Sequence, residues 1–269
     1  MASETKSPLI LWHFLSLDAP TAAAVWTAFI AIANRVHLPW TAPLSMAIAV
    51  WMLYAADRLL DTEDLEPRHH FHHAHRSAFI AGIVLASIIL AFLLPHIPSE
   101  SIHLYLILGG LVFGYFVVIH AMHSAHRLPK ELAVGVCFAA AVFIPTVARR
   151  PDLRLALIPS ALLFAMLCSL NCLFIYAWEH AEAPSNQPPH WTTSFALCHL
   201  TLIAVINTAA SLALAILDYR SPRPIPAAIA LSTALLISLH VRRKSHSVLT
   251  LRASADLVLL TPLIFLPLV

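Results

Sequence analysis

The chain has few charged residues and few glycines. Only 11% of its 269 residues are charged, five are glycine, and 59% are hydrophobic. A soluble domain normally carries about 25% charged residues, so this composition excludes an ordinary soluble fold and indicates a membrane protein. The formal net charge of +2 is too small to favour nucleic acid as a partner.

Cysteine is also scarce. All four cysteines lie inside apolar runs and lack the paired spacing of a zinc ribbon: Cys137, Cys168, Cys172 and Cys198. Disulfides and a thiolate metal site are therefore not expected. The opening stretch, residues 1–20, breaks its apolar run at Asp18 and Pro20. It fits a cleaved signal peptide poorly and is interpreted as a short interfacial lead-in.

Long apolar runs bounded by charges, prolines or histidines are abundant. About 20 apolar residues in a helix cross the roughly 30 Å hydrocarbon core of a bilayer. The runs predict nine transmembrane helices, at about residues 20–36, 40–56, 77–95, 102–122, 131–148, 153–178, 192–217, 225–241 and 249–268. We expect an all-α, single-domain bundle over residues 1–269, with a central cavity open toward the cytoplasmic side.

Lysine and arginine are unevenly divided between the two predicted ends of the bundle. One end, which includes the opening stretch, holds Lys6, Arg58, Arg68, Arg76, Arg127, Lys130, Arg242, Arg243, Lys244 and Arg252. The other end holds Arg35, Arg149, Arg150, Arg154, Arg220 and Arg223. Because cytoplasmic loops carry the excess of basic residues, the first end is predicted to be cytoplasmic, in what we expect to be a bacterial inner membrane.

Carboxylates gather at the same end. One acidic cluster follows the second predicted span, at Asp57, Asp61, Glu63, Asp64 and Glu66, and another follows the sixth, at Glu179 and Glu182. On a continuing helix, Asp57 and Asp61 project from one face with about 5 to 6 Å between their Cβ atoms. Paired carboxylates suit Mg²⁺, which binds through one or two of them plus substrate phosphate oxygens. A helix end that is simply solvated is the alternative interpretation.

Four segments resemble the UbiA-type superfamily of intramembrane aromatic prenyltransferases. The segment "LYAADRLLD", residues 53–61, supplies two aspartates and the arginine of the family's first aspartate-rich motif, although Leu53 and Tyr54 replace its leading Asn-Asp. In "LNCLFIYAWEHAE", residues 170–182, Asn171 stands where the second motif has an aspartate. The segments "RLPKELAVGVCFAAAVFIP", residues 127–145, and "RRKSHS", residues 242–247, resemble the starts of the family's fifth and ninth helices.

The resemblance implies Mg²⁺-dependent transfer of a prenyl group from a polyprenyl diphosphate to an aromatic or other lipid-soluble acceptor. It implies Asp57, Asp61 and Lys130 as catalytic residues. It implies metal ligands at Asp57, Asp61, Asn171, Glu179 and Glu182, and substrate-binding residues at Arg58, Arg68, Arg127, Tyr176, Lys244 and Ser245. An allylic carbocation would need an apolar chamber lined by aromatic faces, for which Tyr176 is the leading candidate.

Histidines support an oxidative alternative. The segment "HHFHH", residues 69–73, and the triplet His120, His123 and His126 have spacings that can place imidazoles on one helix face. Such groups bind iron or zinc, as in di-iron membrane desaturases and hydroxylases, but a third histidine box is missing. Imidazoles near Arg68 and Arg76 could instead contact anionic headgroups or a diphosphate. A non-catalytic, lipid-binding relative of the prenyltransferases and, more weakly, a transporter are the remaining hypotheses.

Overall fold

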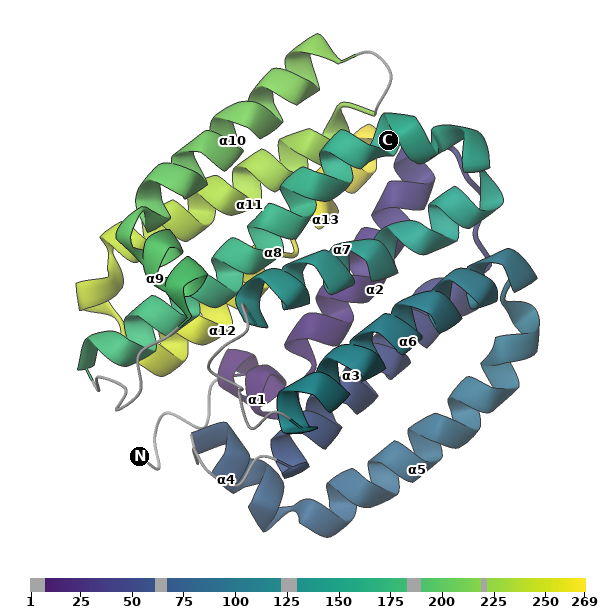
Figure 1. Cartoon of the computed structure of the whole chain (residues 1–269), viewed down its shortest axis with the longest axis horizontal. Helices are drawn as coiled ribbons and strands as arrows, with labels where there is room; N and C mark the ends of the chain where they lie inside the picture. Colours follow the sequence, from purple (N-terminus) through teal and green to yellow (C-terminus); the bar gives the residue numbers. More distant parts are fainter. Residues whose placement is uncertain (1–7, 61–66, 122–129, 183–189, 219–221) are drawn as a thin grey trace.

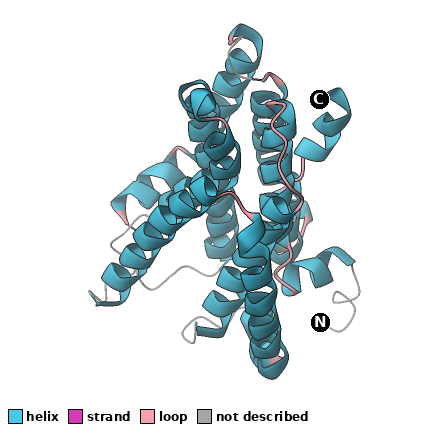
Figure 2. Ribbon diagram, turned by 90° about the vertical axis from the view of Figure 1, so that its right-hand side faces the viewer, coloured by secondary structure: helices cyan, strands magenta, loops and turns pink. Residues whose placement is uncertain are grey.

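The computed structural model describes residues 8–60, 67–121, 130–182, 190–218 and 222–269. Within these ranges the regular structure is entirely helical, and Figure 2 shows only helices joined by short connections. The helices are α1 (Pro8–Phe14), α2 (Asp18–Ala33), α3 (Thr41–Leu60), α4 (Pro67–Ala74), α5 (Arg76–Leu93), α6 (Ser99–Ala121), α7 (Lys130–Arg149), α8 (Arg154–Glu182), α9 (Trp191–Cys198), α10 (Leu200–Leu217), α11 (Pro224–Val241), α12 (Val248–Val258) and α13 (Pro262–Phe265). The all-α prediction is confirmed.

Seven helical segments of the described chain are long and apolar enough to cross a membrane. They are Thr41–Leu60, Arg76–His96, Lys130–Arg149, Pro151–Ala181, Leu200–Leu217, Pro224–Val241 and Val248–Leu268. An eighth is obtained if α1 and α2, which meet at an angle of 91°, count as one broken span. The chain is therefore an integral membrane protein. Nine spans stay a prediction. The ninth predicted span would be α6, of which the segment Ser99–Gly114 counts as a shorter apolar helix.

Consecutive long helices run alternately between two ends of the bundle (Figure 1). α1, α4 and α9 gather at the end where α3 and α8 finish and where α7 and α12 begin. This is the end at which the basic and acidic clusters were predicted to meet. Side-chain hydrogen bonds connect the helices at this end. Ser16, which follows α1, is bonded to His72 of α4, and Thr193 of α9 donates to Glu131 of α7.

The core is formed where α2, α7, α8 and α11 pack together. Trp26 is fully buried, with its ring centroid 4.3 Å from that of Phe164 on α8. α5 lies at the periphery, in contact mainly with α3. Only 17% of the most apolar stretch of the segment Arg76–His96 is buried inside the protein. Most of its side chains therefore face the lipid.

Prolines inside two of the spans free backbone carbonyls that other helices satisfy. Pro145 in α7 has no N–H to donate to Ala141, four residues earlier, and the Tyr105 hydroxyl of α6 donates to that carbonyl over 3.2 Å. Pro262, which begins α13, likewise has no N–H for the carbonyl of Val258, four residues earlier. The Ser232 hydroxyl of α11 donates to that carbonyl over 3.1 Å. Such partners are needed because lipid offers backbone groups no hydrogen bonds.

Candidate functional site

A sharp turn between α1 and α2 places two ionisable side chains inside the protein. Ser16 in this turn has a φ of 57°, a left-handed conformation that is uncommon outside glycine. The chain therefore folds back, so that Nδ1 of His13 lies 2.7 Å from Oδ2 of Asp18. His13 is 0% and Asp18 2% exposed. Asp18 opens α2, where its other oxygen accepts a 2.9 Å hydrogen bond from the N–H of Ala19, and a carboxylate is favoured at this helix terminus.

Residues of α8 and α12 extend this pair. Oδ2 of Asp256 on α12 lies 3.6 Å from Nδ1 of His13. Asn171 on α8 donates from Nδ2 to Oδ1 of Asp256 over 3.0 Å. Four helices, α1, α2, α8 and α12, thus contribute to one buried polar cluster.

α3 joins the cluster through Arg58, which is 2% exposed. Its Nη1 donates to the Ser16 hydroxyl, and that hydroxyl lies 3.0 Å from Nε2 of His72 on α4. The Arg58 guanidinium also stabilises the Asp18 carboxylate electrostatically and sits 5.7 Å from the centroid of the Tyr54 ring. We call the set His13, Ser16, Asp18, Arg58, His72, Asn171 and Asp256 the polar centre.

Two polar atoms in the polar centre have no hydrogen-bond partner among the described residues. They are Nε2 of His13 and Oδ1 of Asn171, both buried. Buried polar groups are normally paired, so each marks a place where a proton, water or ion could be accepted. The polar centre holds two carboxylates against one guanidinium, which leaves a negative charge whenever His13 is neutral.

Nearer the end of the bundle, a second contact links α8 to α12. Arg252 donates from Nη1 to Oε1 of Glu179, and both side chains are mostly buried. Glu179 lies eight positions from Asn171, about 12 Å along α8. The two are therefore engaged at different depths, one with Asp256 and the other with Arg252.

The sequence-predicted site residues are placed unevenly. Asp57 is exposed in the last turn of α3, while neighbouring Arg58 turns into the polar centre. Lys130, Lys244 and Ser245 are exposed at the same end of the bundle. Asp61 and Arg127, and the side chains of Arg68 and Glu182, lie outside the described part of the chain.

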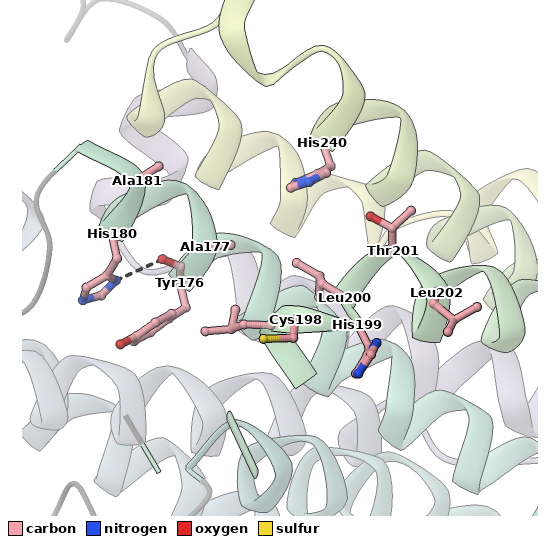
Figure 3. A pocket seen from close by; sticks show the side chains of 11 residues that line it. Tyr176, Ala177, His180, Ala181, Cys198, His199, Leu200, Thr201, Leu202 and His240 are labelled. Carbon is pink, nitrogen blue, oxygen red and sulfur yellow. Dashed lines mark hydrogen bonds between the residues drawn. The ribbon is translucent and has the colours of Figure 1, made fainter. Parts of the chain in front are cut away.

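Tyr176 borders a hollow of about 390 Å³ between α8, α9, α10 and α11. Figure 3 shows Tyr176 and His180 on one wall and His199 and His240 on others. His180 stacks on the Tyr176 ring with centroids 3.8 Å apart, and its Nδ1 lies 3.0 Å from the Tyr176 carbonyl oxygen. The remaining lining residues are Ala177, Ala181, Leu197, Cys198, Leu200, Thr201 and Leu202.

Histidines of the segment 70–75 do not assemble a metal-ligand group with one another. In the described ranges, the group of histidine, cysteine and carboxylate side chains close enough to share an ion is His13, Asp18 and Asp256. His72 bonds to Ser16, and Nδ1 of His75 lies 2.9 Å from the Phe71 carbonyl oxygen. His123 and His126, and the side chains of His69 and His120, lie outside the described part of the chain.

Sequence reasoning missed His13, Asp18, His72 and Asp256 as members of one site. A signal existed for two of them. Asp18 interrupts an apolar stretch and Asp256 is the lone carboxylate of the last span, and ionisable residues inside spans usually serve a function. Comparison with protein-family models, with curated proteins and with solved structures gave no match for this chain.

Proposed function

We propose that the protein catalyses Mg²⁺-dependent transfer of a prenyl group from a polyprenyl diphosphate to a lipid-soluble acceptor. One observation carries the proposal. Arg58, from the end of α3, and Asn171, from α8, belong to the same polar centre although 113 positions separate them. The two segments that resemble the aspartate-rich motifs therefore approach one another at one end of the bundle.

Asp57 is our candidate for a Mg²⁺ ligand among the described residues. Its carboxylate is exposed in the last turn of α3, where a diphosphate could reach it, and carboxylate oxygen is the donor that Mg²⁺ prefers. Asp61 follows four positions later in the sequence. Glu179 suits the ion less well, since its carboxylate already neutralises Arg252. When bound, Mg²⁺ would stabilise the negative charge that develops on the departing diphosphate.

Cationic side chains at this end of the bundle would assist diphosphate departure. Lys130 begins α7 and Lys244 follows α11, and both are exposed. Fixed positive charge is most effective when it is positioned before the transition state forms. Arg58, which is buried, would act by holding the end of α3 in place rather than by contacting the substrate.

The hollow beside Tyr176 could receive the apolar part of a substrate. It opens between α8, α9, α10 and α11 near the end at which Asp57 and Lys130 lie. Its walls combine leucine and alanine side chains and the Tyr176 ring with His180, His199 and His240 (Figure 3). An aromatic face in such a chamber attracts the allylic cation. We place this end of the bundle in the cytoplasm, from the distribution of basic residues.

Release of inorganic diphosphate, with an added membrane lipid extract or water taking the prenyl group, tests the function without knowledge of the natural acceptor. Protein purified in detergent and in lipid nanodiscs would be incubated with geranyl, farnesyl, geranylgeranyl and solanesyl diphosphates, with Mg²⁺ or with a chelator. We expect Mg²⁺-dependent release by the wild type and a loss of roughly 100-fold or more in Asp57→Asn and Asp61→Asn. Asp152→Asn is the matched control and should retain activity, because Asp152 lies just before the start of α8, at the other end of the bundle from Asp57.

Two outcomes would reject prenyl transfer. Release that is absent with every diphosphate in both media would favour a non-catalytic lipid-binding relative. Iron that copurifies with the chain and is lost when His69 and His73 are replaced would favour the oxidative alternative.

A further inference from the structure

The polar centre contains a cluster whose donor atoms could share one ion. One nitrogen of His13 and one oxygen each of Asp18 and Asp256 lie within 4.8 Å of one another. We propose that His13, Asp18 and Asp256, together with Oδ1 of Asn171, form a buried binding site for a divalent transition-metal ion. This site is separate from the Mg²⁺ site proposed at Asp57, and it does not depend on prenyl transfer.

The donors lie within a few tenths of an ångström of the spacing that coordination of one ion requires. Ligands about 2.1 Å from a metal stand about 3.0 Å apart at an octahedral right angle and about 3.4 Å apart at a tetrahedral angle. Nδ1 of His13 lies 2.7 Å from Oδ2 of Asp18 and 3.6 Å from Oδ2 of Asp256. Small side-chain adjustments would bring all three donors to bonding distance, with the metal replacing the proton that His13 shares with Asp18.

Asn171 supplies an independent indication of a ligand. Its side chain is 5% exposed, and its Nδ2 is fixed on Oδ1 of Asp256. The second amide atom, Oδ1, is buried and has no hydrogen-bond partner in the described structure. Because this side chain contacts one of the three ligands, a rotation that turns its unused carbonyl oxygen toward the ion would supply a fourth ligand.

Charge balance also favours a cation. With His13 neutral, Asp18 and Asp256 carry two negative charges, and Arg58 supplies one positive charge while donating to Ser16. A net buried anion in a membrane protein is unfavourable. A divalent ion would remove this excess. A proton on His13 or on Asp256 is the competing explanation, which the experiment distinguishes from a metal ion.

The donor set selects the kind of metal. Imidazole nitrogen favours manganese, iron or zinc over Mg²⁺, whereas two carboxylates and an amide oxygen disfavour copper(I), which prefers sulfur. The ligands come from α1, α2, α8 and α12. A bound ion would therefore fix α1 against α2, α8 and α12.

Electron paramagnetic resonance with Mn²⁺ as the probe tests the site directly. Full-length protein carrying Asp57→Asn would be stripped of metal with a chelator and titrated with Mn²⁺. The substitution prevents Mn²⁺ from binding at the Mg²⁺ site proposed at Asp57. We expect a single bound Mn²⁺ per chain, with pulsed spectra showing hyperfine coupling to one imidazole ¹⁴N. Asp256→Asn should weaken binding roughly 100-fold, because it replaces a charged ligand by a neutral one.

His13→Gln tests the nitrogen ligand specifically, since the variant should lose the ¹⁴N coupling. His246→Gln, at an exposed histidine near the start of α12, should keep both coupling and affinity. The wild-type and Asp57→Asn spectra remain decisive if the His13 or Asp256 variants do not fold. Absence of Mn²⁺ and Zn²⁺ binding to folded protein, or bound Mn²⁺ without nitrogen coupling, would overturn the proposal and leave a proton on His13 or Asp256 as the explanation. Neither result bears on diphosphate release.

Discussion

Asn171 donates a 3.0 Å hydrogen bond to Asp256, which joins α8 to α12 across 85 positions of sequence. The two helices are joined a second time by Glu179 and Arg252. Along α8 the two contacts are about 12 Å apart, whereas along α12 they are about 6 Å apart. The long side chain of Arg252 accounts for the difference, so the last span is fixed to α8 both inside the bundle and near its end.

Replacing Glu179 by Gln should destabilise the protein because it leaves the Arg252 guanidinium, 11% exposed, without its carboxylate partner. Loss of a charged hydrogen-bond partner at a mostly buried site costs about 1.5–3 kcal/mol. Unfolding in mixed detergent, followed by circular dichroism, measures the change. Asp152→Asn is the control, since Arg150 and Asp152 are 51% and 60% exposed, and it should leave stability unchanged. Equal effects of the two substitutions would contradict a structural role for the pair.

The positions of most helices could be predicted from the sequence, because an apolar run bounded by polar residues has one solution in a bilayer. The segments 131–148 and 225–241 became α7 (Lys130–Arg149) and α11 (Pro224–Val241). Two predicted spans are interrupted instead. The segment 192–217 divides at His199 into α9 and α10, and the segment 249–268 divides before Pro262 into α12 and α13.

The interruption before Pro262 is accompanied by a contact that no local pattern reveals. The carbonyl of Leu259 is satisfied by Trp26, which lies 233 positions earlier. The candidate site was likewise predicted only in part, because some of its residues are brought together by contacts between distant parts of the sequence. Asn171 and Arg58 were identified from motif position, but His13 and Asp18 enter the site through the α1–α2 turn at Ser16, which an apolar pattern does not specify.

Trp26→Phe should keep the packing of the ring but remove the 2.8 Å hydrogen bond from its indole N–H to the carbonyl of Leu259. Trp26 is fully buried, so water cannot replace the lost donor. We expect a loss of about 1–3 kcal/mol in unfolding free energy. Trp40→Phe, at a side chain that is 71% exposed, should change stability far less when both variants are unfolded under the same conditions.

Tyr105 and Pro145 should depend on one another. Tyr105→Phe removes the donor to the Ala141 carbonyl, which Pro145 cannot satisfy, and this should cost about 1 kcal/mol. In a Pro145→Ala background the new backbone N–H can donate to the same carbonyl. The Tyr105→Phe substitution should then have little effect. A double-mutant cycle on thermal unfolding gives the coupling energy, and additive effects of the two substitutions would refute this account of the hydrogen bond.

Gly135 permits the closest approach between α7 and α8. A Cβ atom at this position would fall on the Ser169 hydroxyl and lie 2.5 Å from the carbonyl oxygen of Ala165. Because the backbone of α8 cannot yield as a flexible side chain would, Gly135→Ala should force the two helices apart and cost about 1–3 kcal/mol. The measurement is again unfolding in mixed detergent, with Gly109→Ala in α6 as the matched control. Gly109 has no neighbour within 4 Å of an added Cβ, and alanine there favours the helix, so this variant should be as stable as the wild type or more so. If Gly135→Ala behaved in the same way, small-residue packing could not be what holds α7 against α8.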